Sequence, residues 1–274
     1  MTELFTPSGV RLRLHSRSPG ELNWLLLPGG PGIGAVSLAG LADAIDVPGA
    51  VWLVDLPGDA DNVTPPGVAP DPFATWPGVL VEAAQLLPDC VYVGHSTGGM
   101  YLLSAPELEG LVRGLALVST SPDATWRPAF VAMTERDPLP AVDEATRRYE
   151  ADPTNENLGA IAVASAEWNF TAGTVDRGRE FLARMPYNKD AVAWSDVHFD
   201  DVYAATWWPT TLPVLVLGGG ADRIVVQTVW DRPGYDTPNV LRRTVDGGAH
   251  FLWFERPEEV RRAFAELTER VLGG

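Results

Sequence analysis

The 274-residue sequence predicts an α/β fold, in which a mostly parallel sheet is flanked by helices and interrupted by a helical insertion. Three observations predict it. Short apolar runs end in glycine, proline or polar residues, helical patterns lie between these runs, and the alternation stops between Thr120 and about Trp208. Nearly continuous runs of leucine and β-branched residues suit parallel strands that are buried on both faces.

The expected strands follow the apolar runs in chain order. The segment VRLRLHS alternates with period two, as a half-exposed strand does. Later runs predict buried strands, and NVLRRTV predicts another strand near the end of the chain. The buried runs are LNWLLLPGG, AVWLVDLPG, CVYVGHS, LVRGLALVST and LPVLVLGGGAD.

Helical patterns are expected at residues 73–87 and 97–109, and the closing segment ERPEEVRRAFAELTERVL predicts a final helix. In that helix Pro257 lies near the first helical position, where proline is common. Glu258 and Glu259 follow it and suit the positive end of the helix dipole. Strands that alternate with helices indicate crossover units on a parallel sheet.

Residues 120–208 are expected to form a helical lobe inserted into a core made of residues 1–119 and 209–274. The segment is rich in Ala, Asp and Glu. It makes up about a third of the chain and holds five of the chain's ten tryptophans. The alternative is a second, tryptophan-rich core without a functional pocket. The five tryptophans are Trp126, Trp168, Trp194, Trp207 and Trp208.

Composition narrows the range of partners. The formal net charge is −16, and an acidic surface repels nucleic-acid phosphates and anionic membranes, so neither is an expected partner. The N-terminal segment lacks the apolar core of a signal peptide, and no run approaches the ~20 apolar residues of a membrane span. We therefore expect a cytoplasmic protein, either a monomer or a homodimer, without an internal disulfide because Cys90 is the only cysteine.

The segment GHSTGG, which follows the run CVYV, predicts a catalytic serine. A strand followed by Gly-x-Ser-x-Gly and a helix is a nucleophile elbow, which holds the serine hydroxyl on a sharp turn above the sheet. Gly94 and Gly98 give room for that turn around Ser96, and the N–H of Thr97 is aimed at developing negative charge. The alternative is a glycine-rich turn with a purely structural role.

A serine nucleophile needs a general base, and the chain offers four histidines. His15 belongs to the first alternating strand, His95 is expected to pack beneath the elbow, and His198 lies among aspartates on a solvated face. His250 lies in the loop DGGAHF, between the strand NVLRRTV and the final helix. A loop in that place can return an imidazole to Ser96, so His250 is the expected base.

The expected third member of the triad is Asp222, which directly follows the buried strand of LVLGGGAD. It precedes His250 by 28 residues, which we interpret as one helix plus one strand, and the order Ser, Asp, His fits this kind of sheet. A helix-capping role for Asp222 is the structural alternative. Asp123, which follows the preceding strand, is the alternative acid.

The loop Pro28-Gly29-Gly30-Pro31-Gly32 is the expected source of a second oxyanion donor. Its glycines let backbone amides approach a reacting carbonyl, and the N–H of Gly30 would form a pair with that of Thr97. Pro31 has no N–H and cannot donate. We also expect the Gly30–Pro31 peptide bond to be cis.

These motifs together resemble those of α/β-hydrolase fold enzymes. The segments PGGPG, DLPG, GHSTGG, GGGAD and GGAH…ERPEEV occur in the order that such enzymes show, and they cover most of the core. The resemblance implies an α/β-hydrolase fold whose inserted lobe, residues 120–208, corresponds to a cap. It also implies hydrolysis by a Ser-Asp-His triad without a metal or organic cofactor, and the sequence holds neither a Cys–His cluster nor a phosphate-binding loop.

The Gly-Gly-Pro-Gly loop and the tail after His250 are similar to the proline iminopeptidase branch. That branch has His where this chain has Pro28, and Trp where this chain has Thr97. The elbow GHSTGG is closer to esterases, C–C bond hydrolases and cofactor-free perhydrolases. Peptidases of the branch hold the substrate's amino group with cap carboxylates, so the resemblance implies substrate binding by Glu167, with Trp168 beside it; a solvated Glu167 or one paired with arginine is the alternative.

The expected function is therefore a serine hydrolase that acts on a small ester, an amide or a short peptide, as a carboxylesterase or a proline iminopeptidase-like aminopeptidase. The aromatic lobe predicts a largely apolar pocket. A C–C bond hydrolase or a thioesterase of small-molecule metabolism is an alternative that uses the same residues. A ligand-binding protein on a hydrolase scaffold is the alternative from a different class.

Overall fold

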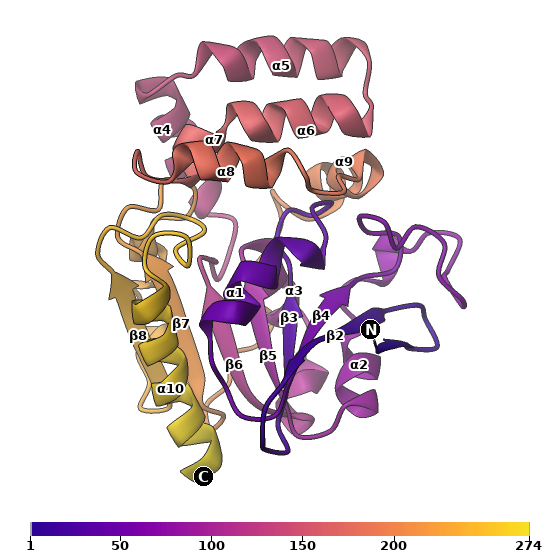
Figure 1. The fold of residues 1–274 in the computed structure, drawn as a ribbon, viewed down its shortest axis with the longest axis vertical. Coiled ribbons are helices and arrows are strands. Elements are labelled where there is room, and N and C mark those ends of the chain that lie inside the picture. Colours follow the sequence, from indigo (N-terminus) through magenta and orange to yellow (C-terminus); the bar gives the residue numbers. More distant parts are fainter. Residues whose placement is uncertain (1, 274) are drawn as a thin grey trace.

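The computed structural model describes residues 2–273, in which eight strands form one sheet in the order β1-β2-β4-β3-β5-β6-β7-β8 (Figure 1). The pairs β1–β2 and β2–β4 are antiparallel, and all other neighbouring pairs are parallel. The strands are β1 (Glu3–Phe5), β2 (Arg11–Arg17), β3 (Asn23–Leu27), β4 (Ala50–Asp55), β5 (Cys90–His95), β6 (Val112–Val118), β7 (Val214–Gly219) and β8 (Val240–Val245). Every strand predicted from the sequence is present, and β1 is additional.

Helices cover both faces of this sheet. Alternate residues of a strand point to opposite faces, so Trp24 and Leu26 of β3 pack in one core cluster with α1 and α10, whereas Leu25 and Leu27 pack in the other with α2 and α3. The helices of the core are α1 (Ala39–Ala44), α2 (Leu80–Leu86), α3 (Thr97–Leu102) and α10 (Pro257–Gly273). Short 3-10 turns are η1 (Ala35–Leu38), η2 (Phe73–Thr75), η3 (Pro106–Gly110), η4 (Gln227–Trp230) and η5 (Pro233–Tyr235).

Two predicted core helices are shorter than expected because prolines interrupt them. Within residues 73–87 the α-helix begins only at Leu80, since Trp76 precedes Pro77 and is extended, as residues before proline prefer. Within residues 97–109 the α-helix ends at Leu102, and Pro106 begins a separate 3-10 turn. The final helix begins at Pro257 as predicted.

Six helices lie in the insertion between β6 and β7. In Figure 1 they stand over the edge of the sheet at which the parallel strands end. They are α4 (Trp126–Arg136), α5 (Pro140–Ala151), α6 (Asn155–Ala164), α7 (Ala166–Asn169), α8 (Val175–Leu182) and α9 (Lys189–His198). We call residues 120–208 the cap; the division of the chain at these two positions stays a prediction.

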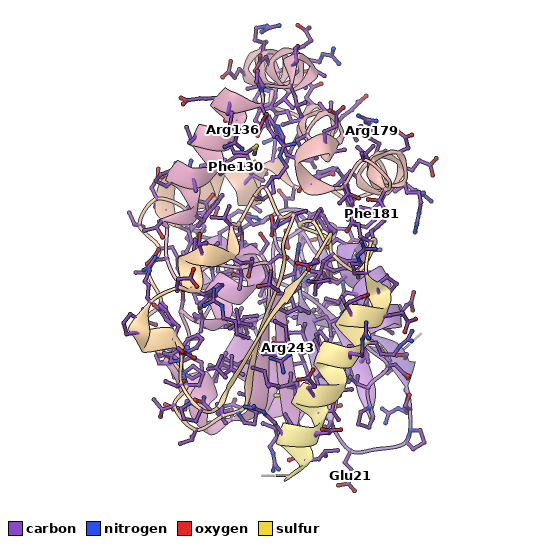
Figure 2. The ribbon with its side chains drawn as sticks, turned by 90° about the vertical axis from the view of Figure 1, so that its left-hand side faces the viewer. Glu21, Phe130, Arg136, Arg179, Phe181 and Arg243 are labelled. Carbon is purple, nitrogen blue, oxygen red and sulfur yellow. The ribbon has the colours of Figure 1, made fainter. Side chains whose placement is uncertain are left out.

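Aromatic side chains pack where the cap meets the core. Phe181 of α8 lies at this boundary (Figure 2), and its ring centroid is 5.4 Å from that of Phe251 and 5.0 Å from that of Phe254. Phe170 stacks on Phe251 at 5.1 Å. These contacts hold the cap against the loop that carries His250. None of the helices formed by residues 2–273 combines the length and the apolar composition needed to cross a bilayer.

Candidate active site

Ser96 stands on a sharp turn between β5 and α3, in a backbone conformation (φ 50°, ψ −125°) that side chains rarely adopt. Such strain costs on the order of 1–3 kcal/mol and is typical of functional sites. The glycines around it are required by space: a Cβ on Gly94 would lie 2.6 Å from Gly99 Cα, and one on Gly98 would lie 2.4 Å from Pro28 O. The elbow therefore has the local geometry that the motif predicts.

Asp222 and His250 are brought together from loops that follow β7 and β8. Nδ1 of His250 lies 3.0 Å from Oδ2 of Asp222 and 3.2 Å from Oδ1. A carboxylate only accepts, so Nδ1 carries the proton, and Nε2 of the neutral ring is then an acceptor. Oδ1 of Asp222 also accepts the N–H groups of Ile224 (2.9 Å) and Val225 (3.0 Å), which fixes the carboxylate. Between Asp222 and His250 the chain forms 3-10 turns and β8, and the helix expected there is absent.

His95 lies buried next to the His250 ring, as expected for a residue beneath the elbow. Its ring centroid is 4.8 Å from that of His250, and its Nε2 lies 3.1 Å from the His250 carbonyl oxygen. Burial, with a contribution from His250, lowers the pKa of His95 well below its usual value. The ring is therefore neutral, and its Nε2–H donates to the His250 carbonyl, which helps to hold that loop.

Ser96 and His250 line one cavity of about 240 Å³ between the core and the cap. Of the residues 2–273, none that lines it is Asp, Glu, Lys or Arg, so its walls carry no carboxylate, ammonium or guanidinium group. Most of the cap residues that line the cavity are apolar. The lining residues are Gly29, Gly30, Pro31, Ile33, His95, Ser96, Thr97, Trp126, Leu158, Ala162, Ser165, Asn169, Leu182, Tyr187, Val192, Ile224, His250 and Phe251.

The glycine loop after β3 lies directly against the serine. A Cβ on Gly29 would be 2.6 Å from Ser96 Cβ, and the Thr97 hydroxyl donates to the Gly30 carbonyl at 3.2 Å. Gly30 has φ +110°, which favours glycine, and the Gly30–Pro31 bond is cis, as expected. Within residues 2–273, the amides of Gly30 and Thr97 donate no hydrogen bond to a protein acceptor.

Two residues predicted to bind substrate lie away from this cavity. Glu167 is half-exposed and its Oε1 lies 2.6 Å from Arg179 of α8, a side chain labelled in Figure 2, so the arginine-paired alternative describes it. Trp168 is buried: its Nε1 donates to the Asp137 carbonyl at 3.1 Å, and its ring packs edge-on against Phe130. Neither side chain lines the Ser96 cavity, and substrate binding by these two residues stays a prediction. Among the five cap tryptophans, only Trp126 lines the cavity.

Asp123, the alternative acid, has a different partner. Its carboxylate forms an ion pair with Arg232 and accepts the N–H and hydroxyl of Thr125. The hydrogen bond from Arg232 lowers the pKa of Asp123 to about 2. The acid that contacts His250 is Asp222. Residues 2–273 contain no cluster of three His, Cys, Asp or Glu side chains suited to a metal ion.

Asp55, the last residue of β4, is a fully buried ion-pair centre. Its Oδ2 lies 2.9 Å from Arg11 and 2.8 Å from Arg13, and its Oδ1 accepts the Ala35 N–H at 2.7 Å. The carboxylate thus joins β2 to the chain just after the glycine loop. The signal was present in VRLRL, whose two arginines alternate and therefore face the same side of the strand.

Asn188 connects the cap to the glycine loop, and no motif had marked it. Its N–H donates to the Gly32 carbonyl at 2.8 Å, and its Nδ2 donates to the Gly58 carbonyl at 2.5 Å. Its Oδ1 accepts the N–H groups of Asp190 (3.0 Å) and Ala191 (3.4 Å), so Asn188 also caps α9. Asn before a helical pattern is a common helix N-cap, which was the available signal.

Asp59 is a buried carboxylate beside this network. Burial, together with the charge of Asp55, raises the pKa of Asp59 to about 7, and the N–H groups of Ala60 and Gly32 oppose the shift. The Ala60 N–H lies 2.8 Å from Oδ1 of Asp59. Near neutral pH the group therefore exchanges a proton close to the glycine loop.

Replacing Asp59 with Asn is expected to remove a pH dependence of stability. The pKa of about 7 in the folded state exceeds the usual value near 4, so the folded state binds more protons between these pH values. The wild type then loses stability as the pH rises from about 4 to about 7, and loses no more above that. In urea unfolding at pH 5, 6, 7 and 8, the free energy of unfolding of Asp59→Asn minus that of the wild type should increase up to about pH 7 and then stay constant. For Asp89→Asn, a control at an exposed residue, this difference should not change with pH. If the difference for Asp59→Asn were also the same at every pH, the raised pKa of Asp59 would be contradicted.

The sequence was also compared with known proteins, and it matches one family. Residues 24–263 match the model of the Alpha/beta hydrolase family. A pimeloyl-[acyl-carrier protein] methyl ester esterase of Xanthomonas campestris pv. campestris (strain B100) is 26% identical over an alignment of 226 residues, and the match covers 77% of this chain and 81% of that protein. A protein of the same description from Xanthomonas oryzae pv. oryzae (strain MAFF 311018) is 24% identical over an alignment of 235 residues, and the match covers 80% of this chain and 84% of that protein.

Solved structures share the fold. An esterase from Thermogutta terrifontis superimposes with a TM-score of 0.69 at 19% identity, covering 99% of both chains. The proline iminopeptidase of Mycobacterium smegmatis gives a TM-score of 0.65 at 20% identity, again over 99% of both chains. The family match spans most of the sequence, and the chain therefore belongs to the alpha/beta hydrolase family.

Proposed function

We propose that this hydrolase is a serine esterase that cleaves small, uncharged carboxylic esters. The observation that carries the proposal is the cavity beside Ser96, whose lining within residues 2–273 is mostly apolar and free of Asp, Glu, Lys and Arg. Its volume of about 240 Å³ is below the ~300–1,000 Å³ of pockets for drug-sized ligands. A short ester fits both its size and its polarity.

In this proposal Ser96 Oγ attacks the ester carbonyl carbon while Nε2 of His250 takes the hydroxyl proton. The carbonyl oxygen becomes an oxyanion, which accepts hydrogen bonds from the amides of Gly30 and Thr97. His250 then gives its proton to the leaving alcohol, and an acyl group remains on Ser96. Water repeats the sequence on the acyl-enzyme, with His250 again as base, and releases the carboxylic acid. Asp222 holds the His250 tautomer and stabilises the imidazolium.

The same cavity argues against an aminopeptidase. A substrate with a free amino end carries an ammonium group, and burying that charge without a partner is costly. Glu167, the carboxylate expected to receive it, is paired with Arg179 outside the cavity. The printed names of the curated relatives describe methyl ester esterases, which also supports ester cleavage.

Ser96→Ala is expected to abolish turnover. Because the nucleophile is lost, hydrolysis of p-nitrophenyl acetate should fall by at least about 10⁴-fold, and labelling by a fluorophosphonate probe should disappear. Ser165→Ala is the matched control, since Ser165 lines the same cavity but its hydroxyl donates to the Ala162 carbonyl and accepts from Nδ2 of Asn169. It should keep both labelling and turnover.

Two results would contradict the proposed function. One is a Ser96→Ala variant that still reacts with the probe or hydrolyses the ester at the wild-type rate. The other is a wild type that cleaves aminoacyl p-nitroanilides but not acyl esters, which would favour the aminopeptidase. Matched thioester and C–C bond substrates in the same assay distinguish the alternatives that use the same residues.

A further inference from the structure

Helix α6 separates the Ser96 cavity from a second, larger hollow in the cap. Leu158 and Ala162 of α6 line the cavity, whereas Gly159, Ala160 and Val163 line the hollow. The hollow has a volume of about 740 Å³ and opens to solvent, and we call it the cap groove. Its other lining residues are Ala141, Glu144, Ala145, Arg148, Asn155, Glu156, Ala164, Ala183, Met185, Pro186 and Tyr187.

The packing of α6 reflects this position between two spaces. Its sequence, NENLGAIAVA, is largely apolar, yet none of its residues is fully buried. An apolar helix usually buries one face against a core. In α6, Ile161 and Ala164 pack against the cluster of Met133, Val142 and Trp168, whereas other apolar residues border the cavity on one side and the groove on the other.

Tyr187 is the one residue among 2–273 that lines both the cavity and the groove. Its hydroxyl donates to the Leu182 carbonyl at 2.9 Å, and its ring lies against Gly159, where an added Cβ would be 2.9 Å from Cδ2. Gly159 thus makes room for the ring. The half-buried Tyr187 thus borders both the cavity of about 240 Å³ and the groove of about 740 Å³.

We propose that Tyr187 determines substrate chain length, because its ring closes the Ser96 cavity and restricts the enzyme to esters with short apolar chains. The proposal rests on the proposed function and deepens it. With the ring in place, a bound chain must end inside the cavity. A smaller side chain at position 187 would join the two spaces, and the apolar chain of a longer ester would then extend along α6 into the groove.

The test is the chain-length profile of p-nitrophenyl esters from acetate to decanoate. Wild-type kcat/KM should fall once the acyl chain outgrows the cavity. In Tyr187→Ala the ratio of kcat/KM for octanoate to that for acetate should rise at least about tenfold, because several methylene groups gain a buried site. Tyr187→Phe is the matched control: it loses the hydrogen bond to Leu182 but keeps the ring, so it should keep the wild-type ratio.

A second substitution locates the gained space. Ala160→Trp places a large side chain in the groove, at a residue that does not line the Ser96 cavity. Combined with Tyr187→Ala, it should return the octanoate-to-acetate ratio to the wild-type value. Alone, it should leave acetate hydrolysis unchanged. Thermal unfolding of each variant confirms that it is folded, and Tyr187→Leu, which should also raise the ratio, replaces Tyr187→Ala if that variant is unstable.

The partition is refuted if folded Tyr187→Ala and Tyr187→Leu keep the wild-type ratio, or if Tyr187→Phe raises it as much as Tyr187→Ala does. It is also refuted if the gain persists when Ala160→Trp fills the groove. These results leave acetate hydrolysis intact and so differ from a failure of the proposed function. If instead the proposed function were wrong, neither the wild type nor any variant would hydrolyse an ester, and both proposals would be refuted.

Discussion

Asp222→Asn is expected to lower kcat for ester hydrolysis by about 10⁴-fold while the protein remains folded, the loss that this exchange causes in a serine-protease triad. The Asp222 carboxylate accepts from Nδ1–H of His250 at 3.0 Å. An amide has a donor in place of one acceptor, so it can hold the other tautomer, in which Nε2 carries the proton and cannot take one from Ser96. The side chain of Asp222 is fully buried, so water does not substitute for it.

Asp123→Asn is the matched control, because Asp123 also follows a strand of the sheet and also lies in a hydrogen-bonded network. Its loss breaks the pair with Arg232, away from His250. We expect kcat to change by no more than a few-fold. Steady-state kinetics with p-nitrophenyl acetate and circular dichroism of both variants are the measurements. If kcat of Asp222→Asn stayed within tenfold of the wild-type value while Asp123→Asn were inactive, Asp123 and not Asp222 would be the acid of the triad.

Asp55→Ala is expected to lower the free energy of unfolding by about 3–5 kcal/mol. Removal of this carboxylate leaves Arg11 and Arg13 without their common partner and the Ala35 N–H without an acceptor. The two arginine side chains are only 13% and 20% exposed, so water replaces the lost contact poorly. An uncompensated charge of this kind costs more than the ion pair contributes.

Asp61→Ala provides the comparison, since Asp61 pairs with the same Arg11 but its side chain is 57% exposed. An exposed pair is worth less than about 1 kcal/mol, and the loss should stay within that. Urea unfolding of the two variants at one pH measures the difference. Equal losses would show that burial of the Asp55 centre does not govern its contribution to stability.

The core and its loops could be predicted because their signals are local. Parallel strands buried on both faces require continuous apolar runs, and each run marked a strand of the observed sheet. The ends of such strands share one edge, so Ser96, Asp222 and His250 could be named from their positions after strands. The helix boundaries near Trp76 and Leu102 were wrong because the helical pattern outweighed the prolines that follow.

The cap residues could not be predicted in the same way. The sequence shows that α6 is apolar but not which of its faces borders the cavity, because both faces border a space. Glu167 and Trp168 lie on the next helix, and their orientation depends on how the cap packs on the core. Asn188 and Asp55 were missed for a related reason: each acts through partners that are distant in sequence.

The cap is tethered to both loops that flank Ser96. The N–H of Asn188 donates to the Gly32 carbonyl at 2.8 Å, and the carbonyl of Asn169 accepts the N–H of His250 at 3.2 Å. Moving either cap residue away from the core would displace a loop that flanks Ser96. A cap that opens to admit substrate must therefore either break these two hydrogen bonds or move the loops beside Ser96 with it.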